Sequence, residues 1–343
     1  MAAITAAGEA PRPEAAQADE GATTTTGSST TTTTVAPTTT AAPSTTAAPA
    51  PPTTRRPTPA TTAPRRPAVR VTPVPLPTGA LAEYRGLGAW IDVFDWTATY
   101  TNGNPGVGTA DIDRMADLGV QSLYVQAARH DSASDVQEPE RLMPLIDRAH
   151  ARGMRVVVWY LPTFEDVAKD LRRLLAIARL PVEGVAVDIE SRVVADAAER
   201  SRRLVDLSHQ LRRSLPGRAI GAIVLPPVVT DVINTNYWPG FPWKEIVPDY
   251  DVWMPMGYWT NRTQASGYRD AYRYTAENID RLRANLGLPG APVHAIGGIG
   301  DKTTAADIEG YHRASVERAG IGGSLYDYRT TGEALWPHLQ RFR

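Results

Sequence analysis

The chain has 343 residues, a formal net charge of −1 and no cysteine. This charge balance gives no reason to expect a nucleic-acid partner or attraction to an anionic membrane. The lack of cysteine excludes disulfides, a thiolate nucleophile and zinc–thiolate sites.

The first eighty residues differ in composition from the rest of the chain. Between Ala22 and Pro64 there are 19 Thr and 8 Pro, with no aromatic and no acidic residue. Such a segment cannot bury enough apolar surface to offset its chain entropy. We therefore expect a disordered N-terminal segment over 1–20 and a disordered Thr/Pro-rich linker over 21–84. All eight Trp lie beyond residue 85, so we expect one domain over 85–343.

The Thr/Pro-rich stretch also bears on location. Stretches of this kind often carry O-linked sugars and hold a domain away from a surface. We expect an extracellular or surface-tethered protein, although residues 1–10 lack the basic start and apolar stretch of a signal peptide. An export or anchoring segment upstream of Met1 would then be the only link to a membrane. A cytoplasmic protein with a low-complexity tail is the alternative.

Strand-like and helix-like patterns alternate from Leu87 onward. The expected strands cover residues 88–96, 121–129, 154–162, 182–191, 218–226, 251–259, 293–299 and 323–328. The expected helices cover 111–118, 139–152, 166–180, 197–215, 268–286, 304–320 and 333–342. A long irregular segment, 227–250, follows the fifth strand.

Eight strands interleaved with helices over about 260 residues predict an α/β fold of the (β/α)8, or TIM, barrel type. A doubly wound open sheet is the alternative. Such a sheet usually has a Gly-rich loop after its first strand, whereas Asp92–Trp96 stands there in this chain.

The fourth strand carries the strongest chemical signal. Because side chains alternate along a strand, Ala186, Asp188 and Glu190 share one face. Residues two apart lie about 6.6 Å apart at Cα, so the two carboxylates repel and the pKa of one of them rises. The sequence therefore predicts a carboxyl group that holds a proton near neutral pH. A structural ion pair with Arg129 is the alternative for these acids.

Barrel enzymes place their chemistry at the C-terminal ends of the strands. The residue types expected there are carboxylates and aromatics, and we predict three catalytic acids, Glu190, Asp188 and Asp92. The predicted substrate-binding residues are Tyr258, Trp259, Trp96, Trp159, Gln126, Arg129, Asp95, Asp327 and Tyr326.

Other chemistries lack their residues at this rim. A Schiff base needs an inward-facing lysine, but Lys169, Lys244 and Lys302 fall in helices or loops. The six histidines are scattered, so we expect neither a bound metal nor a cofactor. Carboxylate chemistry on a substrate that stacks on aromatic rings remains, and glycoside hydrolysis fits it best.

Two motifs resemble those of glycoside hydrolase family 18, the chitinase-like barrels. The stretch from Glu183 to Glu190 (EGVAVDIE) is similar to that family's fourth-strand signature Asp-Gly-x-Asp-x-Asp-x-Glu. Met256-Gly257-Tyr258 is similar to its sixth-strand Met-x-Tyr. The resemblance implies that Glu190 is the general acid, that Asp188 orients a substrate acetamido group and that Tyr258 hydrogen-bonds the intermediate.

The chain departs from that signature at three positions: Glu183 replaces the leading Asp, Ala186 the middle acid and Ile189 the usual aromatic. Asp92 on strand one, with Asp188-Ile189-Glu190, also resembles the family 25 lysozyme-like barrels. We therefore predict a glycosidase-like barrel that acts as a monomer on a cell-wall or extracellular polysaccharide. Asp92 is the candidate second carboxylate if the substrate has no acetamido group.

Two alternatives remain open. A non-catalytic carbohydrate-binding barrel is the first, and Ala186 favours it. The second is a barrel enzyme acting on a phosphorylated substrate, because Gly297-Gly298-Ile299-Gly300 resembles a phosphate-binding glycine turn. Trp238 and Trp243, in the long segment after strand five, either form a wall of the cleft or only attach that segment to the barrel.

Overall fold

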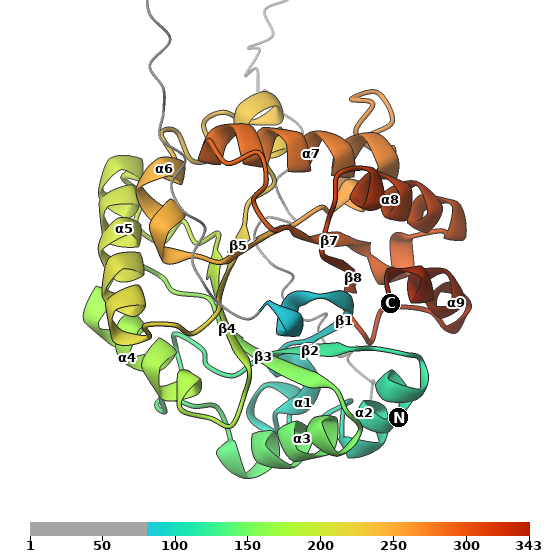
Figure 1. The fold of residues 1–343 in the computed structure, drawn as a ribbon. Helices are drawn as coiled ribbons and strands as arrows, with labels where there is room; N and C mark the ends of the chain where they lie inside the picture. The colour runs from blue at the N-terminus through green and yellow to red at the C-terminus, as the bar shows by residue number, and fades with distance from the viewer. Residues whose placement is uncertain (1–80) are drawn as a thin grey trace, which may run out of the picture. The chain divides into compact units, whose positions relative to one another are not determined.

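The computed structural model describes residues 81–343, which form a barrel of parallel strands enclosed by helices (Figure 1). The strands are β1 (Gly86–Ile91), β2 (Ser122–Gln126), β3 (Arg155–Tyr160), β4 (Gly184–Ile189), β5 (Ile220–Val224), β6 (Val252–Pro255), β7 (His294–Ile299) and β8 (Gly322–Tyr326). The helices are α1 (Val93–Trp96), α2 (Thr109–Asp117), α3 (Pro139–Ala151), α4 (Val167–Ala178), α5 (Ala197–Ser214), α6 (Trp243–Ile246), α7 (Ala271–Leu286), α8 (Ala305–Glu317) and α9 (Trp336–Leu339). The predictions for residues 1–80 lie outside the described residues.

The eight strands form one sheet in the order β6-β5-β4-β3-β2-β1-β8-β7, with parallel pairing throughout. Two isolated bridges, Trp253 with Val293 and Met256 with Ile296, join β6 to β7 and close the ring. The predicted (β/α)8 barrel is therefore confirmed, and the doubly wound sheet is excluded.

Aromatic and small side chains fill the interior of the barrel. Trp90 on β1 stacks on Tyr124 of β2, with ring centroids 4.3 Å apart. Its indole nitrogen donates to the Ser324 hydroxyl at 2.7 Å. His294 is fully buried beside them and bonds to Ser324, Tyr124 and the Tyr84 carbonyl. These contacts fill the barrel interior below the C-terminal ends of the strands, which is therefore a packed core rather than a pore.

A short helix closes the end of the barrel where the strands begin. Ala82–Tyr84, which we placed in the linker, form a 3-10 helix that belongs to the barrel. The Tyr84 hydroxyl donates to the carbonyls of Val185 and Ala219 at 2.8 and 3.3 Å. A Cβ atom on Gly221 would lie 2.9 Å from the Tyr84 ring, so a glycine is required for this close approach.

The predicted strand one ends earlier than expected. β1 stops at Ile91, and Asp92 begins the short helix α1. The Asp92 side chain accepts from the Phe94 amide at 2.8 Å, and the Asp95 side chain accepts from the Asp92 amide at 2.9 Å. This reciprocal pair is a capping box, and it turns the chain at the mouth of the barrel. Thr304 and Asp307 form a second capping box at the start of α8.

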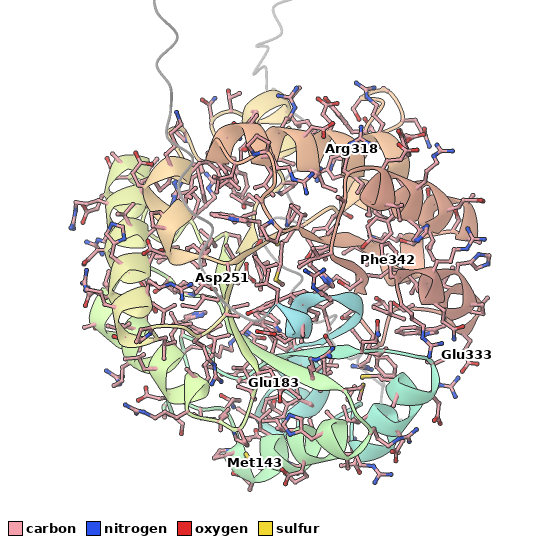
Figure 2. All side chains as sticks on the ribbon, viewed as in Figure 1. Met143, Glu183, Asp251, Arg318, Glu333 and Phe342 are labelled. Carbon is pink, nitrogen blue, oxygen red and sulfur yellow. The ribbon has the colours of Figure 1, made fainter. Side chains whose placement is uncertain are left out.

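Charged side chains occupy the outer surface of the helices. Figure 2 shows their nitrogen and oxygen atoms around the rim, where Arg318 and Glu333 are labelled. Arg318 pairs with Asp280 at 3.1 Å, and Glu333 pairs with Arg114. Within residues 81–343, every helix is too short or too polar to cross a lipid bilayer.

Candidate active site

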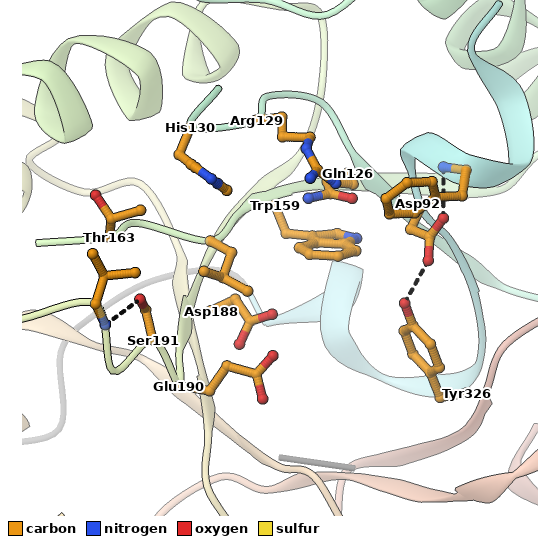
Figure 3. A pocket seen from close by; sticks show the side chains of 13 residues that line it. Asp92, Gln126, Arg129, His130, Trp159, Thr163, Asp188, Glu190, Ser191 and Tyr326 are labelled. Carbon is orange, nitrogen blue, oxygen red and sulfur yellow. Dashed lines mark hydrogen bonds between the residues drawn. The ribbon is translucent and has the colours of Figure 1, made fainter. Parts of the chain in front are cut away.

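A cavity of about 230 Å³ lies at the C-terminal ends of the strands. It is lined by acids, aromatics and loop residues from the first four strands and from β8. The lining residues are Asp92, Phe94, Gln126, Arg129, His130, Trp159, Leu161, Thr163, Asp188, Glu190, Ser191, Val193 and Tyr326. Figure 3 shows Asp188 and Glu190 on one side of this cavity, with Asp92 and Tyr326 across from them.

Strand β4 brings Asp188 and Glu190 to the cavity, as its alternation predicts. The Asp188 side chain is buried, and within the described residues its Oδ1 atom has no hydrogen-bond partner. Burial, and then the charge of Glu190, raise the pKa of Asp188 well above its ordinary value. The pair therefore keeps a proton to higher pH than an exposed carboxyl group does.

A hydrogen bond from Tyr258 or Gln126 would favour the ionised form of Asp188. The Gln126 side chain accepts from the Val93 amide instead, at 3.2 Å. Burial, and then the charges of Glu190 and Asp188, raise the pKa of the Tyr258 hydroxyl. With no hydrogen bond to its Oδ1 atom among residues 81–343, burial is the main cause of the raised pKa of Asp188.

Asp92 faces the cavity from the start of α1. Its Oδ2 atom accepts from the Tyr326 hydroxyl at 2.7 Å. Burial, and then the nearby Asp327, raise the pKa of Asp92 to about 6, while the Tyr326 bond opposes the rise. Asp92 thus titrates close to neutral pH on the side of the cavity opposite the β4 pair.

Asp92, Asp95 and Asp327 form a compact acid cluster, each offering an oxygen within 4.8 Å of the others. Burial, and then the charge of Asp92, raise the pKa of Asp95 to about 8. Each acid already accepts a backbone amide, from Phe94, Asp92 and Thr330 respectively. These three residues are where a cation could bind, but their oxygens are engaged in holding the chain, so we assign no metal.

The predicted site residues divide into two groups. Seven of them line the cavity: Asp92, Gln126, Arg129, Trp159, Asp188, Glu190 and Tyr326. The other five do not line it: Tyr258, Trp259, Trp96 and Asp95, which are buried, and Asp327, which is half-buried.

The two tryptophans of the second group belong to the core. Trp96 lies in α1, is 1 % exposed and donates from its indole nitrogen to the Gln126 carbonyl at 3.2 Å. Trp259 is fully buried, with its ring 5.2 Å from that of Tyr311. Our expectation that they stack on a sugar is therefore wrong for this cavity, because neither ring reaches its lining.

Tyr258, Asp95 and Asp327 stand behind the lining residues. The Tyr258 ring contacts that of Tyr326, 6.0 Å away, and it is 2 % exposed. Asp95 caps α1, and Asp327 accepts from the Thr330 amide at 2.9 Å. A role for them would therefore act through Asp92 and Tyr326, which do face the cavity.

The glycine turn that suggested a phosphate site has another function. Gly297 and Gly298 are residues of strand β7 rather than of a loop. A Cβ atom on either would lie within 3 Å of the Trp259 ring. The glycines make room for that ring, and the cavity does not include them. Their packing against Trp259 accounts for two of the three glycines of the motif without a phosphate.

The aromatic residues of the long segment after β5 attach it to the barrel. Trp238 donates to the Ser201 hydroxyl at 2.9 Å and lies 4.1 Å below the Arg200 guanidinium. Ring contacts continue from Trp238 through Phe241 and Trp243 to Trp253 on β6. Of the two alternatives for Trp238 and Trp243, attachment is the one observed.

Sequence reasoning missed several lining residues, chiefly Phe94, His130, Thr163 and Ser191. All of them lie in or just after strand-end positions. His130 and Ser191 directly follow residues that we did predict, so a wider window at each strand end would have found them. Phe94 was hidden within the segment that we assigned to strand one.

Arg129 lines the cavity but does not pair with the β4 acids. Its Nε atom donates to Asp131 at 2.7 Å, and its guanidinium carbon lies 4.9 and 4.7 Å from the ring centroids of Phe94 and Tyr100. The structural ion pair with Asp188 and Glu190, the alternative left open by the sequence, is therefore not formed.

Fold and cavity together define a TIM barrel with an acid-lined pocket at the carboxyl ends of its strands. Among solved structures, it is similar to the Bacillus cereus spore cortex-lytic enzyme SleL, with 9% identity, a TM-score of 0.55 and coverage of 75% of this chain and 74% of that one. A family 18 chitinase from Cycas revoluta matches at 11% identity and TM-score 0.55, over 75% of this chain and 98% of its own. A class V chitinase from Pseudomonas fluorescens matches at 11% identity and TM-score 0.54, over 75% and 99%.

At these identities the likeness is one of fold. The chain has a TIM barrel like those of family 18 chitinases, as its motifs led us to expect. No protein-family model matches it, and no curated protein sequence matches it significantly.

Proposed function

We propose that this protein is a glycoside hydrolase that cleaves a cell-wall or extracellular polysaccharide. The observation that carries the proposal is the buried Asp188–Glu190 pair, which shares a cavity with Trp159 and faces Asp92. The similar folds of chitinases and of a spore cortex-lytic enzyme support it. The Thr/Pro-rich segment of the sequence supports an extracellular location.

In this proposal Glu190 is the proton donor. It protonates the bridging oxygen, and the bond from that oxygen to the anomeric carbon breaks with both electrons leaving on the oxygen. The proton that the pair holds lies on Glu190 before this step, and the charge of the neighbouring Asp188 favours its return to Glu190 afterwards. Glu190 recovers its proton from the water that adds to the anomeric carbon.

The positive charge that develops on the sugar needs a partner on the opposite face. An acetamido group on the substrate would supply it if the sugar is an amino sugar. Otherwise Asp92 is the carboxylate in position, because it faces the pair across the cavity (Figure 3). Its pKa of about 6 makes it largely ionised at neutral pH.

Replacement of Glu190 tests the proposal. Glu190→Gln keeps the shape of the side chain but cannot donate the proton, so turnover should fall by about 10²–10⁴-fold. Release of reducing ends from a panel of polysaccharides measures it, and the thermal midpoint should stay the same. Glu183→Gln is the matched control, because Glu183 precedes the same strand and is largely exposed. Unchanged turnover in Glu190→Gln would eliminate the assignment.

A carbohydrate-binding barrel without turnover is the second candidate. Ala186 favours it, because the acid expected at that position of the fourth strand is missing. This candidate predicts that insoluble chitin or peptidoglycan retains the protein while no polysaccharide of the panel is cleaved. Retention together with cleavage that depends on Glu190 decides for the hydrolase.

A further inference from the structure

The wall of the cavity that lies across Trp159 from Asp188 and Glu190 is built from the loop between β2 and α3. This loop contributes Arg129 and His130 to the lining. In the view of Figure 3, both lie on the opposite side of Trp159 from Asp188 and Glu190. The cavity thus has an acidic side and a side that offers hydrogen-bond donors.

The guanidinium of Arg129 is held in place while keeping its terminal nitrogens available. The rings of Phe94 and Tyr100, which contact each other edge to face, pack beside the guanidinium, and Asp131 accepts from Nε. Within residues 81–343, neither terminal nitrogen of Arg129 has a hydrogen-bond partner. The side chain is 21% exposed. Two parallel N–H groups on a planar fork match the two oxygens of a carboxylate.

Buried contacts fix the backbone that presents Arg129. Arg173, only 1 % exposed, donates to the carbonyls of Arg129 and Ser132. Glu138 accepts from the amides of Ala98 and Thr99 at 2.8 and 2.7 Å, which holds the segment that carries Tyr100. The position of the guanidinium is therefore set before any ligand binds, which reduces the entropy cost of binding.

His130 complements Arg129 without adding charge. Burial lowers the pKa of its imidazole, so the ring is neutral at neutral pH. A neutral imidazole can donate one hydrogen bond and accept another. The lining then has one fixed positive charge, on Arg129, across Trp159 from Asp188 and Glu190 in the view of Figure 3.

We propose that Arg129, assisted by His130, binds a carboxylate on the substrate, and that the substrate is therefore an acidic glycan. The carboxylate belongs either to a uronic acid or to a carboxylated ether on an amino sugar, and it lies beside the bond to be cleaved. A neutral glycan such as chitin would offer these two nitrogens only uncharged acceptors, which bind a guanidinium more weakly than a carboxylate does. The acidic side of the cavity repels a carboxylate, so only one orientation of the glycan is favoured. This inference rests on the proposed glycan substrate but not on turnover.

Binding to the Glu190→Gln protein tests it, because no cleavage interferes. Peptide-free glycan strands of peptidoglycan carry a lactyl carboxylate on alternate sugars. Their methylamide derivatives have the same shape without the charge, and hyaluronan oligosaccharides carry a uronate instead. By calorimetry, the free-acid form of one of these two glycans should bind about ten- to a hundredfold more tightly than its amide. The glycan that shows this difference identifies the source of the carboxylate.

Arg129 variants locate the effect. Arg129→Gln in the same background should bind the acid and the amide equally. The affinity lost on removing the substrate carboxylate and the affinity lost on removing the guanidinium are then not additive. Arg129→Met, which keeps a side chain packed against the rings of Phe94 and Tyr100, should also bind the acid and the amide equally. Arg148→Gln is the control, because Arg148 on α3 pairs with Asp113 and does not line the cavity. A tenfold preference that persists in both Arg129 variants would show that another group reads the carboxylate.

The outcomes separate this inference from the proposed function. Equal binding of acid and amide forms, with turnover retained in the wild-type protein, overturns the inference alone. Preferential binding of the acid without any turnover supports the inference and overturns the hydrolase. No binding to any of these glycans overturns both. If an Arg129 variant fails to fold, the comparison of acid with amide still decides.

Discussion

The mouth of the barrel holds two groups of acids that differ in what surrounds them. Asp188 and Glu190 end β4, whereas Asp92, Asp95 and Asp327 gather where β1 and β8 end. Burial raises the pKa of acids in both groups. In the second group, backbone amides engage each of the three carboxylates.

Asp188 has no such support, since its Oδ1 atom has no partner within residues 81–343. A buried carboxyl atom without a partner costs stability, which a folded protein tolerates mainly where function uses it. The comparison therefore assigns chemistry to the β4 pair and mainly chain positioning to the acid cluster, with Asp92 between the two roles.

Replacing Asp188 by a neutral residue should show the difference between the two groups of acids most clearly. Asp188→Asn replaces the carboxyl group that shares a proton with Glu190 by an amide that cannot. Turnover should therefore fall about 10²-fold or more. Its thermal midpoint should stay or rise, because the amide removes a buried, repelled carboxyl group. Asp327→Ala should do the reverse, losing about 1 kcal/mol of stability with the Thr330 bond while most turnover remains. Reducing-end assays and thermal melts on both variants measure this, and a stability loss in Asp188→Asn with normal turnover would contradict it.

The acid cluster should also make stability depend on pH. Asp92 and Asp95 keep their protons in the folded chain up to about pH 6 and about pH 8, whereas in the unfolded chain they lose them near pH 4. The folded state therefore binds more protons across this window, and the free energy of unfolding should fall as pH rises from about 4 to about 8.

Asp95→Asn should reduce that fall, because an amide has no proton to lose yet still accepts the Asp92 amide. Thermal midpoints at pH 5, 6, 7 and 8 measure the slope. Asp196→Asn, at the exposed start of α5, is the control and should leave the slope unchanged. An equal slope in wild type and Asp95→Asn would show that Asp95 does not carry the titration.

The smallest effect concerns the hydrogen bond between Tyr326 and Asp92. Tyr326→Phe removes a bond that lowers the pKa of Asp92, so that pKa should rise. If ionised Asp92 takes part in the reaction, the acidic limb of the kcat/KM profile moves to higher pH. Stability should fall by about 1 kcal/mol.

Tyr160→Phe provides the matched control for that change. The Tyr160 hydroxyl donates to Asp170 at 2.6 Å, and neither residue lines the cavity. The stability loss should be similar, but the pH profile should not move. If the kcat/KM profile moved along the pH axis in both variants, the movement would not arise from the pKa of Asp92.

The fold was predictable because its signals are local and repeated. Helices α3 and α5 carry apolar residues at helical spacing, and their bounds match the expected ones to within a residue. The barrel followed from eight such alternations. The first strand was misassigned because Val93, Phe94 and Trp96 read as a continuation of it. Asp92 and Asp95, three residues apart, have the spacing of a capping box, and that signal prevailed.

The site was predictable where one strand determined it. Alternation alone brings Asp188 and Glu190 to one face of β4. Trp96 and Trp259 were misplaced because their burial depends on residues distant in sequence, the Gln126 carbonyl for one and the glycines of β7 for the other. No pattern within a single strand contains that information.

The alanine at position 186 has a consequence for how this barrel could change. Ala186 pairs in register with Trp159 on β3 and Gly221 on β5, and Tyr84 and Met254 fill the space at Gly221. An acid introduced at 186 alone would enter an occupied, apolar volume without a partner. Tyr84 or Met254 would first have to be replaced by a smaller residue, and that replacement would lower the stability of the fold. The packing around Gly221 thus makes an alanine, rather than an acid, the residue that this barrel interior accommodates at position 186.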